Sequence, residues 1–245
     1  MALRRRWQLF WQHRLMRRVP KDDFLNRLPS SMLGHGMMQD GNYALFDKAI
    51  SEMPEGGAVL EIGSFGGLSM NLILYLLFKK KKAFPVFSCD PWIYSGYEDT
   101  DTSKSDAIDG WPSVNREAYM EYVLTAFKNA IRLFHPNALP YSCRMKSADF
   151  FLAWGEGKTV TDIFDRTVSP GGPLSFVYVD GDHSYQAASA DVENSLQFLL
   201  PGGLLLLDDS ADGLPYGSAI LAKELLKRKD LKLVERNPNY LFRKV

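Results

Sequence analysis

Acidic side chains follow two apolar runs of the chain, and their types and spacing could hold a cationic ligand. The two groups are Asp180-Gly181-Asp182-His183, after residues 174–179, and Asp208-Asp209, after residues 204–207. Carboxylates gathered in an apolar interior repel one another and lose hydration, so a cation should offset their charge. A sulfonium cofactor and a metal ion would both serve.

A glycine-containing segment follows an earlier apolar run and reads Glu61-Ile62-Gly63-Ser64-Phe65-Gly66-Gly67-Leu68-Ser69. Gly63 and Gly67 let the backbone turn tightly and come close to a ligand just before a helix begins. The segment therefore predicts a nucleotide-type ligand, with a purely structural turn as the alternative. A dinucleotide fingerprint has glycine where this chain has Phe65, which disfavours NAD-dependent redox chemistry.

A single carboxylate, Asp90, ends the next apolar run at residues 85–89. A carboxylate accepts two donors at once, so this residue suits the two hydroxyls of a ribose. The alternative is an ordinary loop-opening aspartate before Pro91.

Short apolar runs alternate with longer periodic stretches, which is typical of a parallel α/β sheet. The predicted strands are 58–62, 85–89, 141–145, 174–179 and 204–207, and the predicted helices are 68–79, 114–134, 148–154, 185–200 and 218–229. Two last runs, 231–235 and 240–244, predict a terminal hairpin around Asn237-Pro238-Asn239. Ligands of such sheets bind outside the carboxyl ends of the strands, where the acidic residues fall.

Three motifs carry a resemblance to class I S-adenosylmethionine-dependent methyltransferases. The segment 61–69 resembles the E-[IL]-G-x-x-x-G-x-S motif of small metal-dependent O-methyltransferases. Residues 179–185, and Leu200-Pro201-Gly202-Gly203 leading to Asp208-Asp209, resemble a group of macrolide-sugar and aminocoumarin-sugar O-methyltransferases and cephalosporin-hydroxylase-like proteins. The resemblance covers about residues 40–245. It implies a Rossmann-like, seven-stranded, mostly parallel sheet of order 3-2-1-4-5-7-6 with helices on both faces.

The resemblance also implies roles for single residues. Gly63, Gly67 and Ser69, with Glu61 nearby, would hold the methionine end of S-adenosylmethionine. Asp90 would hold the ribose, and Ser147 would lie near the adenine.

On the acceptor side, the metal ligands of the family map to Asp180, Asp208 and Asp209, and its general base maps to Asp182. His183 is a second candidate for the base. Three carboxylates without a thiolate favour a hard divalent cation, Mg²⁺ above Mn²⁺ or Ca²⁺. The structural alternative is that these acids end a strand and cap the next helix.

The expected function is therefore metal-assisted O-methylation of a hydroxyl on a small molecule, such as a sugar or a secondary metabolite. Two alternatives stay open: a metal-independent methyltransferase with another acceptor, and a non-catalytic protein that binds S-adenosylmethionine.

Composition narrows the partners and the compartment. Lys plus Arg and Asp plus Glu number 29 each, so no global charge favours a nucleic-acid partner. The two cysteines, Cys89 and Cys143, form no disulfide framework or zinc-ligand cluster, and we expect reduced thiols in a cytoplasmic protein.

The N-terminal segment differs from the rest of the chain. Residues 1–20 hold six arginines and no acid, with aromatic residues at helical spacing. We expect residues 1–40 to be a helical extension and residues 41–245 to be the methyltransferase domain, with a loop insertion at 94–112. The basic helix could pack on the protein body, form a homodimer interface, or lie peripherally on an anionic membrane surface.

Overall fold

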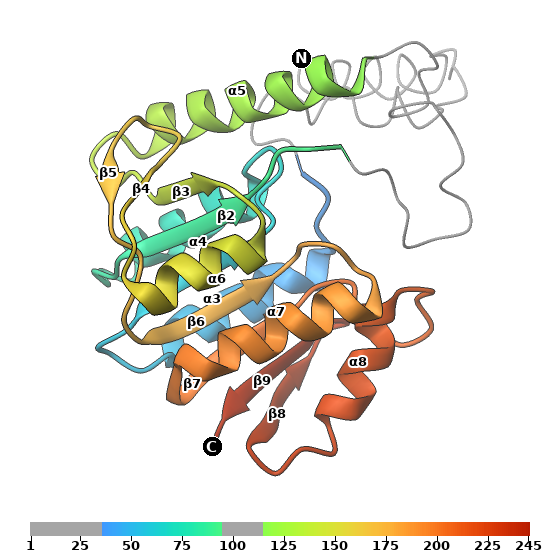
Figure 1. Cartoon of the computed structure of the whole chain (residues 1–245). Helices are drawn as coiled ribbons and strands as arrows, with labels where there is room; N and C mark the ends of the chain where they lie inside the picture. The colour runs from blue at the N-terminus through green and yellow to red at the C-terminus, as the bar shows by residue number, and fades with distance from the viewer. Residues whose placement is uncertain (1–35, 95–114) are drawn as a thin grey trace, which may run out of the picture.

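Buried apolar runs form a seven-stranded sheet in the computed structural model, which describes residues 36–94 and 115–245 (Figure 1). Its order is β3-β2-β1-β6-β7-β9-β8. The strands are β1 (Ala58–Ile62), β2 (Val86–Asp90), β3 (Tyr141–Arg144), β6 (Leu174–Val179), β7 (Leu199–Leu207), β8 (Leu231–Arg236) and β9 (Tyr240–Lys244). Within this sheet β3, β2, β1, β6 and β7 are parallel to their neighbours in that order, and β9 is antiparallel to both β7 and β8. The expected order 3-2-1-4-5-7-6 and the terminal hairpin are confirmed.

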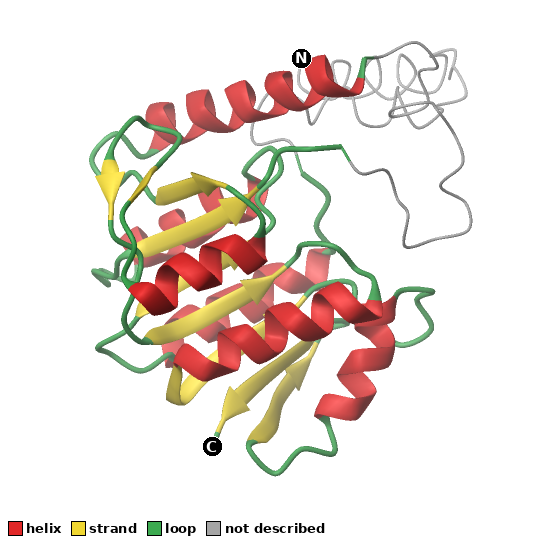
Figure 2. Cartoon of the chain, in the orientation of Figure 1, coloured by secondary structure: helices red, strands yellow, loops and turns green. Residues whose placement is uncertain are grey.

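Helices cover both faces of the sheet, as Figure 2 shows. One face carries α3 (Asp40–Glu52), α4 (Leu68–Lys79) and α5 (Arg116–Phe134), and the other carries α6 (Ser147–Glu156), α7 (Tyr185–Phe198) and α8 (Gly217–Leu225). Strand β6 is buried along its whole length because helices cover both faces of the sheet, and this is why its sequence is an almost continuous apolar run.

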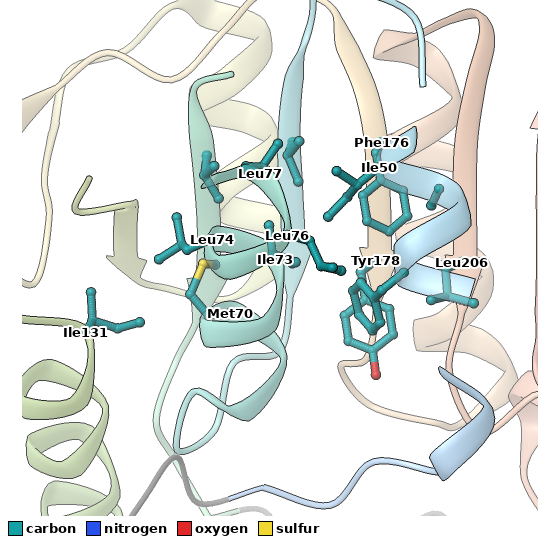
Figure 3. Packing of buried hydrophobic residues seen from close by; sticks show 14 of the residues in the cluster. Ile50, Met70, Ile73, Leu74, Leu76, Leu77, Ile131, Phe176, Tyr178 and Leu206 are labelled. Atoms are coloured by element: carbon teal, nitrogen blue, oxygen red, sulfur yellow. The ribbon is translucent and has the colours of Figure 1, made fainter. Parts of the chain in front are cut away.

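The two faces of the sheet have separate hydrophobic cores. Figure 3 shows part of the first, where side chains of α3 and α4 pack on β6 and β7. In this cluster Tyr178 lies against the edge of Phe46, with ring centroids 4.6 Å apart. The apolar body of Tyr178 thus belongs to the core, while its hydroxyl reaches the end of β6, where Asp180 follows.

Helix α3 and a small hairpin are absent from the sequence-based expectation. The helix is anchored by four side chains with no solvent exposure, Leu45, Phe46, Ala49 and Ile50. The hairpin pairs β4 (Val160–Thr161) with β5 (Thr167–Val168). Asp162 stabilises its turn because the carboxylate accepts hydrogen bonds from the backbone of Phe164 and Arg166.

Several boundaries also differ from the expected ones. Strand β7 begins at Leu199 rather than at residue 204, because Leu199 pairs with Leu174 before residues 200–203 bulge out of register. Helix α8 ends at Leu225 rather than at residue 229, and Arg228 in the following turn pairs with Asp230.

The expected helix within residues 1–20 and nearly all of the loop 94–112 lie outside the described residues. Among the helices that the structure describes, none is long and apolar enough to cross a membrane.

Candidate active site

The turn after β1 brings together the two expected halves of the site. The cofactor half is residues 61–69 with Asp90, and the acceptor half is residues 180–183 with Asp208 and Asp209. Gly63 has φ +83°, and a Cβ there would lie 1.9 Å from the carbonyl oxygen of Asp180. Gly67 caps α4 with φ +92°, and its Cβ would lie 2.8 Å from the ring of Phe127. Both positions therefore require glycine, for the backbone angle and for the close approach.

Asp90 organises this turn. One oxygen, Oδ2, accepts hydrogen bonds from the backbone N–H groups of Ser64 and Phe65, both at 2.9 Å, and Oδ1 accepts from the N–H of Trp92 at 2.6 Å. Burial raises the pKa of Asp90, and these three backbone hydrogen bonds oppose the shift. Because a carboxylate oxygen can accept two hydrogen bonds, Oδ1 keeps room for one further donor, such as a ribose hydroxyl.

Glu61 is the buried acid of the cofactor half. Its side chain has no solvent exposure, Oε2 accepts a 2.6 Å hydrogen bond from Ser64 Oγ, and Oε1 has no partner. Burial raises the pKa of Glu61 to about 7, while hydrogen bonds from Ser64 and Ser69 lower it. An orphaned carboxylate oxygen fits a ligand with a cationic N–H group, as the methionine end of S-adenosylmethionine has.

Ser147 opens α6 and has a partner that the sequence did not suggest. Its hydroxyl hydrogen-bonds with Asp191 of α7, which is 4% exposed. Burial raises the pKa of Asp191 to about 6, and the Ser147 hydrogen bond opposes this. Asp191 Oδ2 lies 3.3 Å from where a Cβ on Gly181 would be. Helix spacing alone gives no signal for this acid, because it resembles any polar residue of a helix.

The acceptor half centres on Asp180 and Asp208, at the ends of neighbouring strands. The Tyr178 hydroxyl donates to Asp180 Oδ2 at 3.0 Å. Burial, the charge of Asp208 and a hydrogen bond with Asp208 raise the pKa of Asp180 well above its usual range.

Two buried amides hold Asp208. Asn42 Nδ2 donates to Asp208 Oδ1 at 2.5 Å, and Asn239 Nδ2 donates to the same oxygen at 2.8 Å. Both asparagines have no solvent exposure. The sequence pattern identified neither asparagine. Asn42 belongs to helix α3, which was not expected, and Asn239 belongs to a hairpin turn in which an asparagine is common for local reasons.

His183 and Asp209 complete the acceptor half, whereas Asp182 stands apart. His183 Nε2 lies 3.6 Å from Asp209 Oδ2 and 3.9 Å from Asp180 Oδ1. Asp209 Oδ1 accepts a 3.4 Å hydrogen bond from Gln39. Asp182 is exposed, and its Oδ1 accepts the N–H of Ser184 at 2.7 Å, which forms an Asx turn before α7, where Ser184 itself is the N-cap.

Within residues 36–94 and 115–245, no group of three or more His, Cys, Asp or Glu side chains is arranged to hold a metal ion. Asp180, Asp208 and Asp209 offer only oxygen donors, the type of ligand that hard divalent cations prefer.

Residues 60–210 match the family model described as a methyltransferase domain. The curated proteins compared with the chain include no match.

Solved structures with the same fold include O-methyltransferases. The chain superposes on the O-methyltransferase NovP with a TM-score of 0.56 and 14% identity, over 86% of this chain and 81% of that one. An O-methyltransferase from Bacillus cereus, solved in complex with SAH, superposes with a TM-score of 0.51 and 14% identity, over 93% of this chain and 92% of that one. CalS11, a TDP-rhamnose 3'-O-methyltransferase, superposes with a TM-score of 0.51 and 16% identity, over 93% of this chain and 88% of that one.

The family match spans most of the site, from β1 through the glycine turn to the acids after β6 and β7. The sheet order is that expected of class I enzymes. The chain therefore belongs to the methyltransferase-domain family and is a class I S-adenosylmethionine-dependent methyltransferase.

Proposed function

We propose that this methyltransferase methylates a hydroxyl oxygen of a small molecule, with a divalent cation on Asp180, Asp208 and Asp209. The observation that carries the proposal is the adjacency of the two halves. Asp180 follows β6 directly against Gly63 of the glycine turn, and Asp208 follows the neighbouring strand β7. An acceptor bound at these acids would thus lie beside the cofactor.

In the cofactor half, the residues would bind and orient S-adenosylmethionine. Glu61 Oε1 would accept from the amino group of the methionine end, and Asp90 Oδ1 from a ribose hydroxyl. When bound, S-adenosylmethionine supplies a methyl group on a sulfonium, and transfer to a hydroxyl leaves a neutral thioether and releases the hydroxyl proton.

In the acceptor half, the carboxylates would hold the cation, which supplies Lewis acidity that lowers the pKa of a bound hydroxyl. Asp180 and Asp208 support this role because their charges already crowd each other, as the raised pKa of Asp180 reflects. Such a site would orient the acceptor oxygen as well as activate it.

We assign removal of the proton to His183, with Asp182 as the alternative. His183 Nε2 lies among the acids of the acceptor half, 3.6 Å from Asp209. The ring also packs against Tyr216, with centroids 5.4 Å apart, which limits its rotation. Asp182 is exposed and already accepts the Ser184 N–H.

A sugar or another small hydroxylated molecule is the acceptor class we propose. The balanced charge of the chain, 29 basic and 29 acidic residues, favours no polyanionic substrate. The fold likeness to a TDP-rhamnose 3'-O-methyltransferase makes nucleotide-linked sugars a natural first group to test.

The test is methyl transfer from radiolabelled S-adenosylmethionine to a panel of nucleotide sugars, free sugars and phenols. We expect turnover with Mg²⁺, loss of turnover in chelator, and recovery when Mg²⁺ is added back. Asp208→Asn should lack activity in every condition while keeping its fold. Full activity in chelator would show instead a metal-independent enzyme, and methylation of amines alone would exclude the hydroxyl acceptor.

A further inference from the structure

Trp92 ties together the two segments that meet at Asp90. Its indole Nε1 donates a 2.9 Å hydrogen bond to the carbonyl oxygen of Phe65, in the glycine turn after β1. The backbone N–H of Trp92 donates to Asp90 Oδ1 at 2.6 Å, and the backbone N–H of Phe65 donates to Asp90 Oδ2 at 2.9 Å. Three hydrogen bonds thus close a ring through Phe65, Asp90 and Trp92.

The backbone conformation that this ring holds is unfavourable by itself. The Gly67 N–H donates to the Ser64 carbonyl at 2.8 Å, so residues 64–67 form a β-turn with Phe65 at its second position. Phe65 has φ +42° there, a left-handed value that such a turn normally gives to Gly, Asn or Asp. Trp92 has φ +46°, which is equally rare for a bulky residue. Strained residues of this kind persist only where their surroundings fix them.

Packing fixes the indole of Trp92 as well. Trp92 is 1% exposed, and its ring lies against Phe127 of α5 in an edge contact, with centroids 5.5 Å apart. Phe127 is also the side chain closest to Gly67, 2.8 Å from where a Cβ would be. One buried aromatic pair therefore supports the glycine turn at two places, at Phe65 through the indole N–H and at Gly67 through the ring of Phe127.

The conformation of Phe65 decides how the two oxygens of Asp90 are used. With the turn in place, the N–H groups of Ser64 and Phe65 both donate to Oδ2, which fills its two acceptor positions. Within the described part of the chain, Oδ1 accepts from the N–H of Trp92 and keeps its second position. If Phe65 relaxed to a negative φ, its N–H would turn away from Oδ2 and the carboxylate would lose its fixed direction.

We propose that Trp92 is a positioning residue for the cofactor, whose indole N–H holds the glycine turn so that Asp90 Oδ1 is aimed at a ribose hydroxyl. The inference rests on the proposed function, in which Asp90 binds the ribose. A partner that is already aimed loses little freedom when the ligand binds, and this raises affinity. Because Trp92 is buried, it acts through Phe65 and Asp90 rather than by contact with the ligand.

Calorimetric titration of the full chain with S-adenosylhomocysteine, and with its analogue that lacks both ribose hydroxyls, tests the inference. The ratio of the two dissociation constants measures how strongly the protein recognises the hydroxyls. In wild type we expect the analogue to bind about 10-fold or more weakly, because Asp90 loses a hydrogen bond to a charged acceptor. In Trp92→Phe the ratio should fall to about threefold or less, because the carboxylate is no longer aimed.

Two further variants separate positioning from packing. Trp154→Phe is the matched control, because the buried indole of Trp154 also donates to a backbone carbonyl, that of Gly172, at 2.8 Å. It should keep the wild-type ratio. Trp92→His keeps a ring nitrogen at the place of the indole nitrogen but loses most of the packing on Phe127. This variant should be less stable than wild type and should still recognise the ribose hydroxyls.

Each other outcome has a definite meaning. If wild type binds the two ligands equally, Asp90 does not bind the ribose, and the positioning role fails with it. If wild type discriminates and a folded Trp92→Phe keeps the same ratio, the positioning role is overturned and the ribose site stands. A lowered ratio in Trp92→His, or in Trp154→Phe, would assign the effect to packing or stability and overturn the inference.

Trp92→His decides alone should Trp92→Phe not fold, since its ratio follows either the retained donor or the lost packing. If neither variant folds, Trp92 serves the fold and the inference is overturned.

Discussion

Gly63 and Asp180 pack so closely that a Cβ on the glycine would lie 1.9 Å from the aspartate carbonyl oxygen. The contact joins the turn that we propose binds the cofactor to the strand end that bears the acids. The backbone confirms the connection, since the Asp180 N–H donates to the Ile62 carbonyl at 2.8 Å. This backbone contact fixes the glycine turn relative to the end of β6.

Gly63→Ala should disable the protein. The methyl group cannot be accommodated by a side-chain movement because the obstacle is backbone, and φ +83° is strained for alanine. We expect a loss of several kcal/mol of unfolding free energy or an insoluble chain. Gly213→Ala is the matched control, with φ +85° but nothing within 4 Å of its Cβ. It should cost about 1–2 kcal/mol in denaturant unfolding. Equal losses in the two variants would refute the close-approach explanation.

The ligand-free protein should become less stable from about pH 4.5 to pH 7 because of Glu61. Its folded pKa is raised to about 7 from an ordinary value of 4.5, so the folded state binds more protons than the unfolded state in this window. The stabilisation is complete below pH 4.5 and is lost as the pH rises through 7. When the unfolding free energy is measured with urea at several pH values in this range, it should fall less steeply with pH in Glu61→Gln than in wild type.

Asp191→Asn gives the comparison for that experiment. The folded pKa of Asp191 is raised to about 6, so its contribution is lost between about pH 3.8 and 6. Asp191→Asn should flatten the profile only below about pH 6. A profile of Glu61→Gln identical to wild type would mean that Glu61 stays ionised in the folded protein.

Tyr178→Phe should lower the unfolding free energy by about 1 kcal/mol. The ring is fully buried against Phe46 and keeps its packing, while Asp180 loses the donor at 3.0 Å. Affinity for S-adenosylhomocysteine should not change, because the hydroxyl serves the acceptor half. Thermal unfolding and calorimetry check the two expectations, and a variant as stable as wild type would show that the hydrogen bond contributes nothing.

Substitution of His183 and of Asp182 should separate the two candidates for the base. His183→Ala should lower kcat by about 100-fold or more, as expected for loss of a general base. Asp182→Ala removes the acceptor of the Ser184 N–H and should change kcat only about two- to threefold. Initial rates with the best acceptor of the panel decide the matter, and the reverse ranking would assign the proton to Asp182.

The sequence predicted the sheet and the glycine turn after β1 well, because these depend on local signals. Apolar runs gave the strands, and glycines marked the turn where positive φ is required, as at Gly63 and Gly67. The acids after β6 and β7 were predicted as one group because parallel strands end at one edge.

Contacts between distant segments could not be read in the same way. Asn42 and Asn239 are 197 positions apart and meet only when α3 and the last hairpin pack on β7. No neighbouring residues in the sequence distinguish Asp191 from other polar residues of a helix, and its interaction with Ser147 arises only in the folded chain. Position along a strand indicates where an acid lies, but its hydrogen-bond partners depend on tertiary packing.

Calorimetric titration of S-adenosylhomocysteine into wild type, Asp208→Asn and Glu61→Gln tests most directly whether the site has two separable halves. Wild type and Asp208→Asn should bind with affinities within about twofold, because Asp208 faces the acceptor side. Glu61→Gln should bind about 10-fold more weakly, because it loses a buried charge-assisted hydrogen bond of about 1.5–3 kcal/mol. Wild-type affinity in Glu61→Gln, or loss of binding in Asp208→Asn, would contradict the account.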